Sequence, residues 1–203
     1  MSEFNPLPGE LVLASASPRR RELLAVLGVK FRVVPADIDE RVWPEEGPED
    51  YVCRIALSKA RAVYDRAGGN VAVLGSDTTV VIDDRILGKP AGREEALAML
   101  KALSGRVHRV LSAVALVDAA GSAARLSSTE VTFRSISEAE ADAYWQTGEP
   151  ADKAGGYAIQ GLAACFVSEI RGSYSGVVGL PLYETAELLN QKGYGPIPGV
   201  GQA

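Results

Sequence analysis

The sequence predicts an α/β protein built on a mixed sheet flanked by helices. Strand-like and helix-like segments alternate along most of the chain, a pattern that is typical of α/β folds. Two long strand-like stretches, residues 107–117 and 124–133, then follow each other with only a short connection between them. Strands joined in this way pair antiparallel, so the sheet is expected to combine them with the parallel strands typical of an alternating chain.

The first half of the chain begins with a short buried strand over residues 11–15. Pro18 then occupies the first turn of a helix that is expected to end before Gly28, because proline suits helix starts and glycine suits helix ends. The other expected elements of this half are a strand over 31–36, an acidic, proline-containing loop over 37–50 and a helix over 48–67.

The second half contains an ambiguous apolar stretch. Residues 71–83 predict either two short strands or one bent strand that is interrupted at 75–78, because Gly75 weakens a strand interior. Ser137 followed by Glu140 predicts a capping box at the start of a later helix. The remaining expected elements are a helix over 91–104, the strands over 107–117 and 124–133, a helix over 137–145, a strand over 165–170 and a helix over 182–189.

No linker or internal repeat divides the chain, so residues 10–191 are expected to form a single α/β domain. The two ends, residues 1–9 and 192–203, contain many glycine and proline residues. Both ends are therefore expected to be flexible.

The composition is that of an acidic globular protein. The chain has 203 residues, of which 47% are hydrophobic and 23% charged, with a formal net charge of −5. The negative charge argues against binding to nucleic acid. No membrane span or signal peptide is visible, so a cytoplasmic protein that binds no membrane is expected. Cys53 and Cys165 are far apart, and both are expected to be small core residues in a reducing compartment.

A cluster of positive charge at a helix start is the most unusual local feature. Residues 19–21 are three consecutive arginines that follow Pro18 directly. The N-terminal end of a helix is already positive, so these guanidinium groups oppose the helix dipole and one another. A bound phosphate, held by the arginines, by backbone N–H groups and by Ser15 and Ser17, would explain them. The alternative is a solvated helix start whose arginines pair with Glu22 or with a distant carboxylate.

Carboxylates at the ends of predicted strands suit a divalent cation. Asp77 follows a buried apolar run and precedes two threonines, while Asp37, Asp39 and Glu40 follow another strand. Carboxylate oxygens are preferred ligands of Mg²⁺, whose coordination substrate phosphates commonly complete. The alternative is that Asp37 and Asp39 only solubilise their loop and that Asp77 caps a turn. We favour the alternative for Asp37 and Asp39, and a functional role for Asp77.

Two lysines and a glutamine are further candidates for contact with a ligand. Lys59 lies in an otherwise amphipathic helix, and Lys89 lies in a glycine–proline turn. Either lysine could bind phosphate or simply be solvated. Gln160 ends a segment, residues 152–161, whose paired glycines suit a binding loop better than a core. The Gln160 carboxamide could read the edge of a base, or could bind its own loop backbone.

Common nucleotide-binding and catalytic signatures are absent from the sequence. There is no GxxxxGK[ST] loop and no GxGxxG motif, so any phosphate site must be built differently. His108 is the only histidine, and its polar neighbours predict an exposed position rather than a catalytic one. Without a second histidine, neither a histidine-dependent triad nor a zinc site is expected.

Five motifs follow one another along the chain: SASPRR, GSDT, GKP, DKAGGYAIQG and GSYSGVVGLPL. Together they resemble the Maf family of nucleoside triphosphate pyrophosphatases, also called septum-formation inhibitors, from residue 11 to about residue 189. The branch of the family that acts on dTTP and UTP is the most similar. The resemblance implies an ITPase-like Maf fold, in which an elongated, twisted mixed sheet is flanked by helices and two lobes enclose an active-site cleft.

The resemblance also implies roles for individual residues. Asp77 matches the family's catalytic carboxylate. The phosphate-binding positions are Ser15, Arg20, Lys59 and Lys89, the base-selecting positions are Arg19, Thr78 and Gln160, and the metal ligands are Asp77 and Glu40. The implied cofactor is a divalent cation (Mg²⁺, Mn²⁺ or Co²⁺), and the implied partners are a nucleoside triphosphate substrate and a second copy of the chain in a homodimer.

The implied reaction cleaves the α–β phosphate bond of dTTP or UTP and releases pyrophosphate, with a link to cell-division arrest. Two alternatives stay open at the level of the sequence. One is the same reaction on 7-methyl-GTP or on a deaminated purine nucleotide, although the 7-methyl-GTP branch typically lacks a threonine like Thr78 and a Gln–Gly loop like that at Gln160. The other is a nucleotide-binding regulator of cell division whose hydrolysis is incidental.

Overall fold

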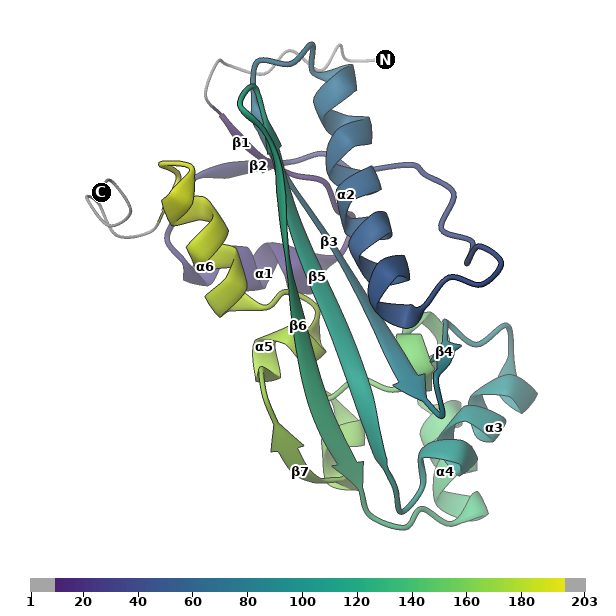
Figure 1. Ribbon diagram of the computed structural model, residues 1–203. Coiled ribbons are helices and arrows are strands. Elements are labelled where there is room, and N and C mark those ends of the chain that lie inside the picture. Colours follow the sequence, from purple (N-terminus) through teal and green to yellow (C-terminus); the bar gives the residue numbers. More distant parts are fainter. Residues whose placement is uncertain (1–9, 196–203) are drawn as a thin grey trace.

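The computed structural model describes residues 10–195, so the ends at 1–9 and 196–203, which are expected to be flexible, lie outside the described residues. Within that range the strands form one seven-stranded sheet in the order β2-β1-β3-β5-β6-β7, with β4 paired to β3 (Figure 1). The strands are β1 (Leu11–Leu13), β2 (Phe31–Val33), β3 (Ala72–Ile82), β4 (Arg85–Leu87), β5 (Val107–Asp118), β6 (Gly121–Phe133) and β7 (Val167–Arg171).

The sheet is mixed, as predicted. Strand β1 pairs parallel with β2 and with β3, whereas the pairs β3–β5, β5–β6 and β6–β7 are antiparallel. Strands β3, β5 and β6 are long and twisted, and they extend through most of the length of the molecule (Figure 1). These three strands therefore connect the two ends of the fold.

Helices cover both faces of the sheet (Figure 1). Because side chains alternate between the faces of a strand, neighbours in β1 contact different helices. Leu13 packs in one cluster with Leu24 and Leu188, whereas Val12 packs on the other face with Val63. The helices are α1 (Pro18–Val26), α2 (Pro48–Arg66), α3 (Arg93–Leu103), α4 (Glu138–Gln146), α5 (Tyr174–Val178) and α6 (Leu182–Gln191).

A separate hydrophobic cluster lies at the other end of the long strands. There Leu100 and Leu103 of α3, Tyr144 of α4 and Phe133 of β6 pack together. Short 3₁₀ helices complete this part: η1 (Glu149–Asp152), η2 (Ala154–Gly156) and η3 (Leu162–Phe166). The division of the core along the sheet agrees with the two lobes that the resemblance implied.

Strand β3 is continuous, so the predicted interruption at residues 75–78 is wrong. Its pairing with β5 runs from Val73 to Val81 without a break. Gly75 serves a close approach instead: an added Cβ would lie 2.2 Å from the Ala56 carbonyl oxygen and 2.8 Å from the Ala60 nitrogen of α2. The missing side chain thus lets the backbone of a helix lie directly on the strand.

Several smaller predictions need correction. Strand β7 begins at Val167, because the residues before it form η3 instead of the strand predicted from residue 165. The short elements β4 and α5 were not predicted, since neither is long enough to show a period in the sequence. Cys53 is only half-buried and Cys165 is exposed, so the prediction that both lie in the core is wrong.

His108 is also misplaced by the sequence prediction, because only 2% of its surface is exposed. Its Nε2 lies 2.8 Å from the Tyr157 hydroxyl, and its ring packs edge-on against Phe133 and Tyr157. In a strand, residues two apart share a face, so His108 lies with Val110 and not with the adjacent Arg109. Arg109, the polar neighbour of His108 within the strand, therefore points to the opposite face.

The burial of His108 predicts a loss of stability in mild acid. Burial lowers the pKa of its imidazole to about 4, whereas an unfolded histidine has a pKa near 6.5. The unfolded chain therefore binds the proton first, and stability that is present above about pH 6.5 falls as the pH drops towards 4. We expect this group to contribute on the order of 3 kcal/mol to that fall.

The measurement is the free energy of unfolding in denaturant at several pH values between 4 and 7, for the parent protein and for His108→Asn. The variant should show a shallower pH dependence in this window, whatever its stability at pH 7. Equal slopes for the two proteins would show that His108 does not control the acid sensitivity.

Candidate active site

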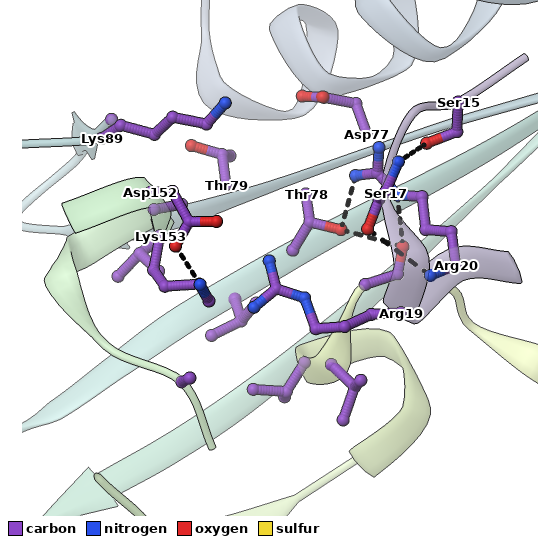
Figure 2. Close-up of a pocket in the computed structure, with 18 of the residues that line it drawn as sticks. Ser15, Ser17, Arg19, Arg20, Asp77, Thr78, Thr79, Lys89, Asp152 and Lys153 are labelled. Carbon is purple, nitrogen blue, oxygen red and sulfur yellow. Dashed lines mark hydrogen bonds and ion pairs between the residues drawn. The ribbon is translucent and has the colours of Figure 1, made fainter. Parts of the chain in front are cut away.

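A cavity of about 860 Å³ opens between the start of α1, the middle of β3, helix α2 and the segment that includes η2. All nine site residues predicted from the sequence line it: Ser15, Arg19, Arg20, Glu40, Lys59, Asp77, Thr78, Lys89 and Gln160. Figure 2 shows side chains from four separate parts of the chain that meet there. The structure thus brings together residues that are up to 145 positions apart in the sequence.

The arginine-rich helix start forms one wall of the cavity. The Ser17 hydroxyl caps α1 by accepting a bond from the Arg20 backbone nitrogen, and Pro18 lies in the first turn, as predicted. The Ser15 hydroxyl accepts a bond from the Ser17 backbone nitrogen at 3.2 Å. Within residues 10–195, no ion pair links Arg19 or its two arginine neighbours to a carboxylate, which favours the anion-binding interpretation over simple surface pairing.

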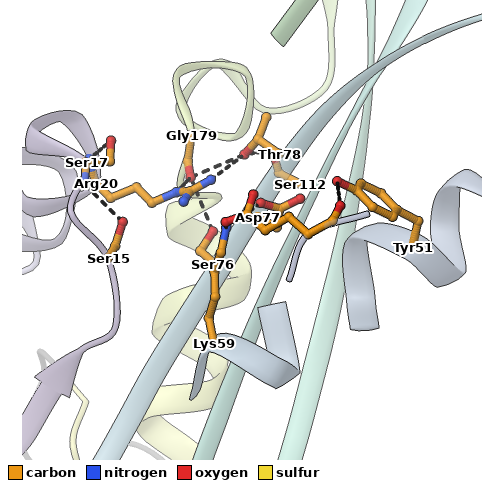
Figure 3. Close-up of polar contacts among 11 residues, drawn as sticks. Ser15, Ser17, Arg20, Tyr51, Lys59, Ser76, Asp77, Thr78, Ser112 and Gly179 are labelled. Atoms are coloured by element: carbon orange, nitrogen blue, oxygen red, sulfur yellow. Dashed lines mark hydrogen bonds and ion pairs between the residues drawn. The ribbon is translucent and has the colours of Figure 1, made fainter. Parts of the chain in front are cut away.

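The side chain of Arg20 is fixed in place by backbone far away in the sequence. Its Nε donates to the Gly179 carbonyl oxygen at 2.8 Å, and its Nη2 lies 3.5 Å from the Thr78 hydroxyl (Figure 3). Burial lowers the pKa of Arg20, while the nearby charges of Asp77 and Glu40 act in the opposite direction. A guanidinium group keeps its charge in proteins, so Arg20 presents a fixed cation to the cavity.

Lys59 links the two candidate carboxylates. Its Nζ lies 2.8 Å from Asp77 Oδ1 and 3.0 Å from Glu40 Oε1. Lys59 of α2 and Asp77 of β3 are only 7% and 6% exposed. Burying either charge without a partner would be costly, and the ion pair between them offsets that cost. The Tyr51 hydroxyl donates to the Glu40 carbonyl oxygen at 3.1 Å and so ties the loop that carries Glu40 to α2.

The two carboxylates fit a divalent cation that shares its coordination with a substrate. Asp77 and Glu40 converge on one nitrogen, and within residues 10–195 the second oxygen of each accepts no hydrogen bond. Across the same residues, no group of three or more histidine, cysteine or acidic side chains is arranged to hold a metal. A pair of hard oxygen donors that relies on phosphate oxygens and water is the set that Mg²⁺ commonly takes.

The remaining predicted residues lie on the opposite side of the cavity. Lys89 is exposed, and its turn is held by a hydrogen bond from the Gly155 nitrogen to the Gly88 carbonyl oxygen. Gln160 is exposed at the cavity and its side chain has no hydrogen-bond partner within residues 10–195. The interpretation in which Gln160 only bonds its own loop is therefore not supported.

Residues 10–192 match the Maf-like protein family, nearly the whole of the described chain. The chain belongs to this family. It is 54% identical to the dTTP/UTP pyrophosphatase of Alkalilimnicola ehrlichii, covering 93% of this chain and 94% of that protein. It is 53% identical to the dTTP/UTP pyrophosphatase of Hahella chejuensis, covering 95% and 97%. Among solved structures it is similar to a dITP/XTP pyrophosphatase from Mycobacterium abscessus, at 24% identity and a TM-score of 0.40, covering 63% and 75%.

The glycine-rich motif of this Maf-like protein at residues 172–182 holds other site residues in position. The Gly179 carbonyl oxygen accepts bonds from Arg20 Nε, from the Ser76 hydroxyl and from the Thr78 hydroxyl. The Ser112 hydroxyl in turn donates to the Gly176 carbonyl oxygen at 2.6 Å. Sequence reasoning recognised this motif but missed its role, because a carbonyl oxygen leaves no side-chain signal in the sequence.

Proposed function

We propose that this protein is a nucleoside triphosphate pyrophosphatase that hydrolyses the α–β phosphate bond of dTTP and UTP, releasing a nucleoside monophosphate and pyrophosphate. The observation that carries the proposal is that the cationic side chains of Arg20, Lys59 and Lys89 line one cavity together with the carboxylates of Asp77 and Glu40. The relatives named dTTP/UTP pyrophosphatase, at 53% and 54% identity over more than nine-tenths of the chain, support the same reaction and substrates.

In this mechanism Arg20, Lys59 and Lys89 bind the triphosphate and neutralise the charge that builds on its oxygens in the transition state. When bound, a divalent cation (Mg²⁺, Mn²⁺ or Co²⁺) would be held by Asp77, by Glu40 or by both, and would polarise the phosphoryl oxygens. An oxygen that holds a cation is a poor base, so where one carboxylate binds the cation the other takes the proton of the attacking water. The Lys59 ammonium holds Asp77 Oδ1 at 2.8 Å, which leaves Oδ2 as the Asp77 oxygen for either role. That water attacks the α-phosphorus in line, and pyrophosphate leaves.

Base selection is assigned to Arg19, Thr78 and Gln160. A carboxamide held in one orientation can donate to O4 and accept from N3–H of uracil or thymine, whereas cytosine presents the reverse pattern. A Gln160 amide that cannot turn over would therefore reject cytosine. The Thr78 hydroxyl lies 2.9 Å from the Ser112 hydroxyl of the neighbouring strand β5, and this hydrogen bond fixes the Thr78 side chain on β3.

The test is a panel of nucleotides offered to one preparation, with pyrophosphate and orthophosphate measured separately. We expect pyrophosphate and a monophosphate from dTTP and UTP, and much slower turnover of CTP, 7-methyl-GTP and dITP. Preference for 7-methyl-GTP or dITP would contradict the substrate assignment. Release of orthophosphate and a diphosphate would contradict the reaction itself.

The homodimer, the cytoplasmic location and the absence of nucleic-acid and membrane partners stay predictions, as do the single domain over residues 10–191 and the link to cell division. Among the helices within residues 10–195, none is both long and apolar enough to cross a membrane. Sedimentation at micromolar concentration tests the dimer directly.

A further inference from the structure

The backbone on both sides of Gln160 is hydrogen-bonded to two side chains, the buried Tyr144 and the half-buried Glu149. Tyr144 of α4, which is 4% exposed, accepts a hydrogen bond from the Ala158 nitrogen at 3.2 Å through its hydroxyl. The same hydroxyl donates to Glu149 Oε1 at 2.6 Å. The other oxygen of Glu149 accepts a bond from the Leu162 nitrogen at 3.0 Å. Hydrogen bonds to these two side chains therefore hold the backbone two residues before and two residues after Gln160.

The contact between Glu149 and this turn is so close that a side chain at residue 161 would displace the carboxylate. A Cβ added at Gly161 would lie 2.3 Å from Glu149 Oε2, although the backbone at Gly161 has an ordinary negative φ of −112°. The turn is also closed by a bond from the Gly161 nitrogen to the Ala158 carbonyl oxygen at 3.0 Å. The carboxylate therefore lies directly against the turn and reaches its backbone without an intervening side chain.

Since the Gln160 side chain has no partner of its own within residues 10–195, the position of its amide depends on this backbone. We infer that Glu149 and Tyr144 are positioning residues that set the choice of base by holding the Gln160 turn, an inference that rests on the proposed function. Charge-assisted hydrogen bonds to backbone N–H groups are among the stronger ones in proteins, which suits a carboxylate to this task. If the turn were less rigid, the Gln160 amide could rotate so that its NH₂ group and its carbonyl oxygen exchange places. The site would then also accept cytosine.

Three variants disturb this arrangement from different sides. Glu149→Gln keeps the shape but replaces one acceptor oxygen by a donor, which must face either the Tyr144 hydroxyl or a backbone N–H. Tyr144→Phe removes the hydroxyl that links Ala158 to Glu149. Gly161→Ala keeps both side chains but displaces the carboxylate. Asp142→Asn is the matched control, because Asp142 also lies on the α4 side of this lobe but pairs with Arg93 and does not line the cavity.

The readout is the ratio of kcat/KM for UTP to that for CTP, with KM and kcat reported separately. We expect each of the three variants to lower this ratio about tenfold or more, mainly through KM, while Asp142→Asn leaves it unchanged. Combining Glu149→Gln with Gln160→Ala should lower the ratio no further than Gln160→Ala alone, because both changes act through one amide.

Hydrogen exchange at the amides of Ala158 and Leu162 gives a second readout that does not need turnover. Both amides should exchange faster in Glu149→Gln and in Gly161→Ala than in the parent protein. If UTP and CTP turnover fall equally in all three variants, or if the ratio does not change, the inference is wrong while the proposed function stands. If the parent protein releases no pyrophosphate from UTP, the proposed function itself fails.

Discussion

Replacing Asp77 with asparagine is expected to lower kcat for UTP by about three orders of magnitude, because an amide cannot accept the proton of the attacking water. The amide also carries no charge with which to hold a divalent cation. The fold should survive the change, since an amide oxygen can still accept the bond that Lys59 Nζ donates at 2.8 Å, and Glu40 remains as a counter-charge at 3.0 Å. The measurement is pyrophosphate release from UTP at saturating substrate.

Asp84→Asn is the matched control for this experiment. Asp84 lies just beyond the end of β3, is exposed, and has a φ of 57° that asparagine adopts readily. It should leave kcat unchanged, because its contact is with Arg109 and it does not line the cavity. Asp77→Asn should also retain nucleotide binding through the cations of the site. A kcat within tenfold of the parent value would remove Asp77 from the catalytic role.

The sequence could predict where the charged groups of the site lie, because charges at these positions would destabilise the fold unless a partner or a ligand compensated them. Three arginines at a helix start oppose the helix dipole, and two of them, Arg19 and Arg20, do line the cavity, whereas Arg21 is exposed outside it. Asp77 beside two threonines in an apolar run is likewise costly unless it has a partner. Strand and helix periods located most of the elements that carry these residues, from α1 to α6.

The partners of those groups could not be predicted, since they are set by contacts between distant segments. Arg20 is oriented by the carbonyl oxygen of Gly179, 159 residues away. Lys59 alone reads as an ordinary surface lysine, and only its position between Asp77 and Glu40 explains why it is buried. Side-chain alternation in a single strand also does not say which face is covered, and His108 was misplaced for that reason.

The sequence was also ambiguous at Gly75, in the middle of β3. A glycine in an apolar run indicates either a break in the strand or a close approach by other backbone, and the local sequence does not distinguish the two. The structure assigns Gly75 to the second case, with α2 lying on it. This assignment makes Gly75 a structural requirement of the site, because the contact sets the distance between Lys59 on α2 and Asp77 on β3.

Gly75→Ala is therefore expected to lower the free energy of unfolding by about 3 kcal/mol, the upper part of the range for overpacked interiors. The new methyl group would lie 2.2 Å from the Ala56 carbonyl oxygen, and backbone cannot relieve this by changing rotamer. Helix α2 must move outward, which separates Lys59 from Asp77. We thus expect turnover to fall as well, even at temperatures where the variant is fully folded.

Denaturant unfolding of Gly75→Ala and of the control Gly92→Ala distinguishes this contact from a general effect of losing glycine. A Cβ at Gly92 would meet no atom within 4 Å, and its backbone is extended, so the control should lose no more than about 1 kcal/mol as a helix-capping position. If Gly75→Ala were as stable as Gly92→Ala, α2 and β3 would accommodate a methyl group for which the structure shows no space, and the proposed role of this contact would be wrong. Reduced stability with full turnover would instead show that the Lys59–Asp77 pair tolerates a shift of α2.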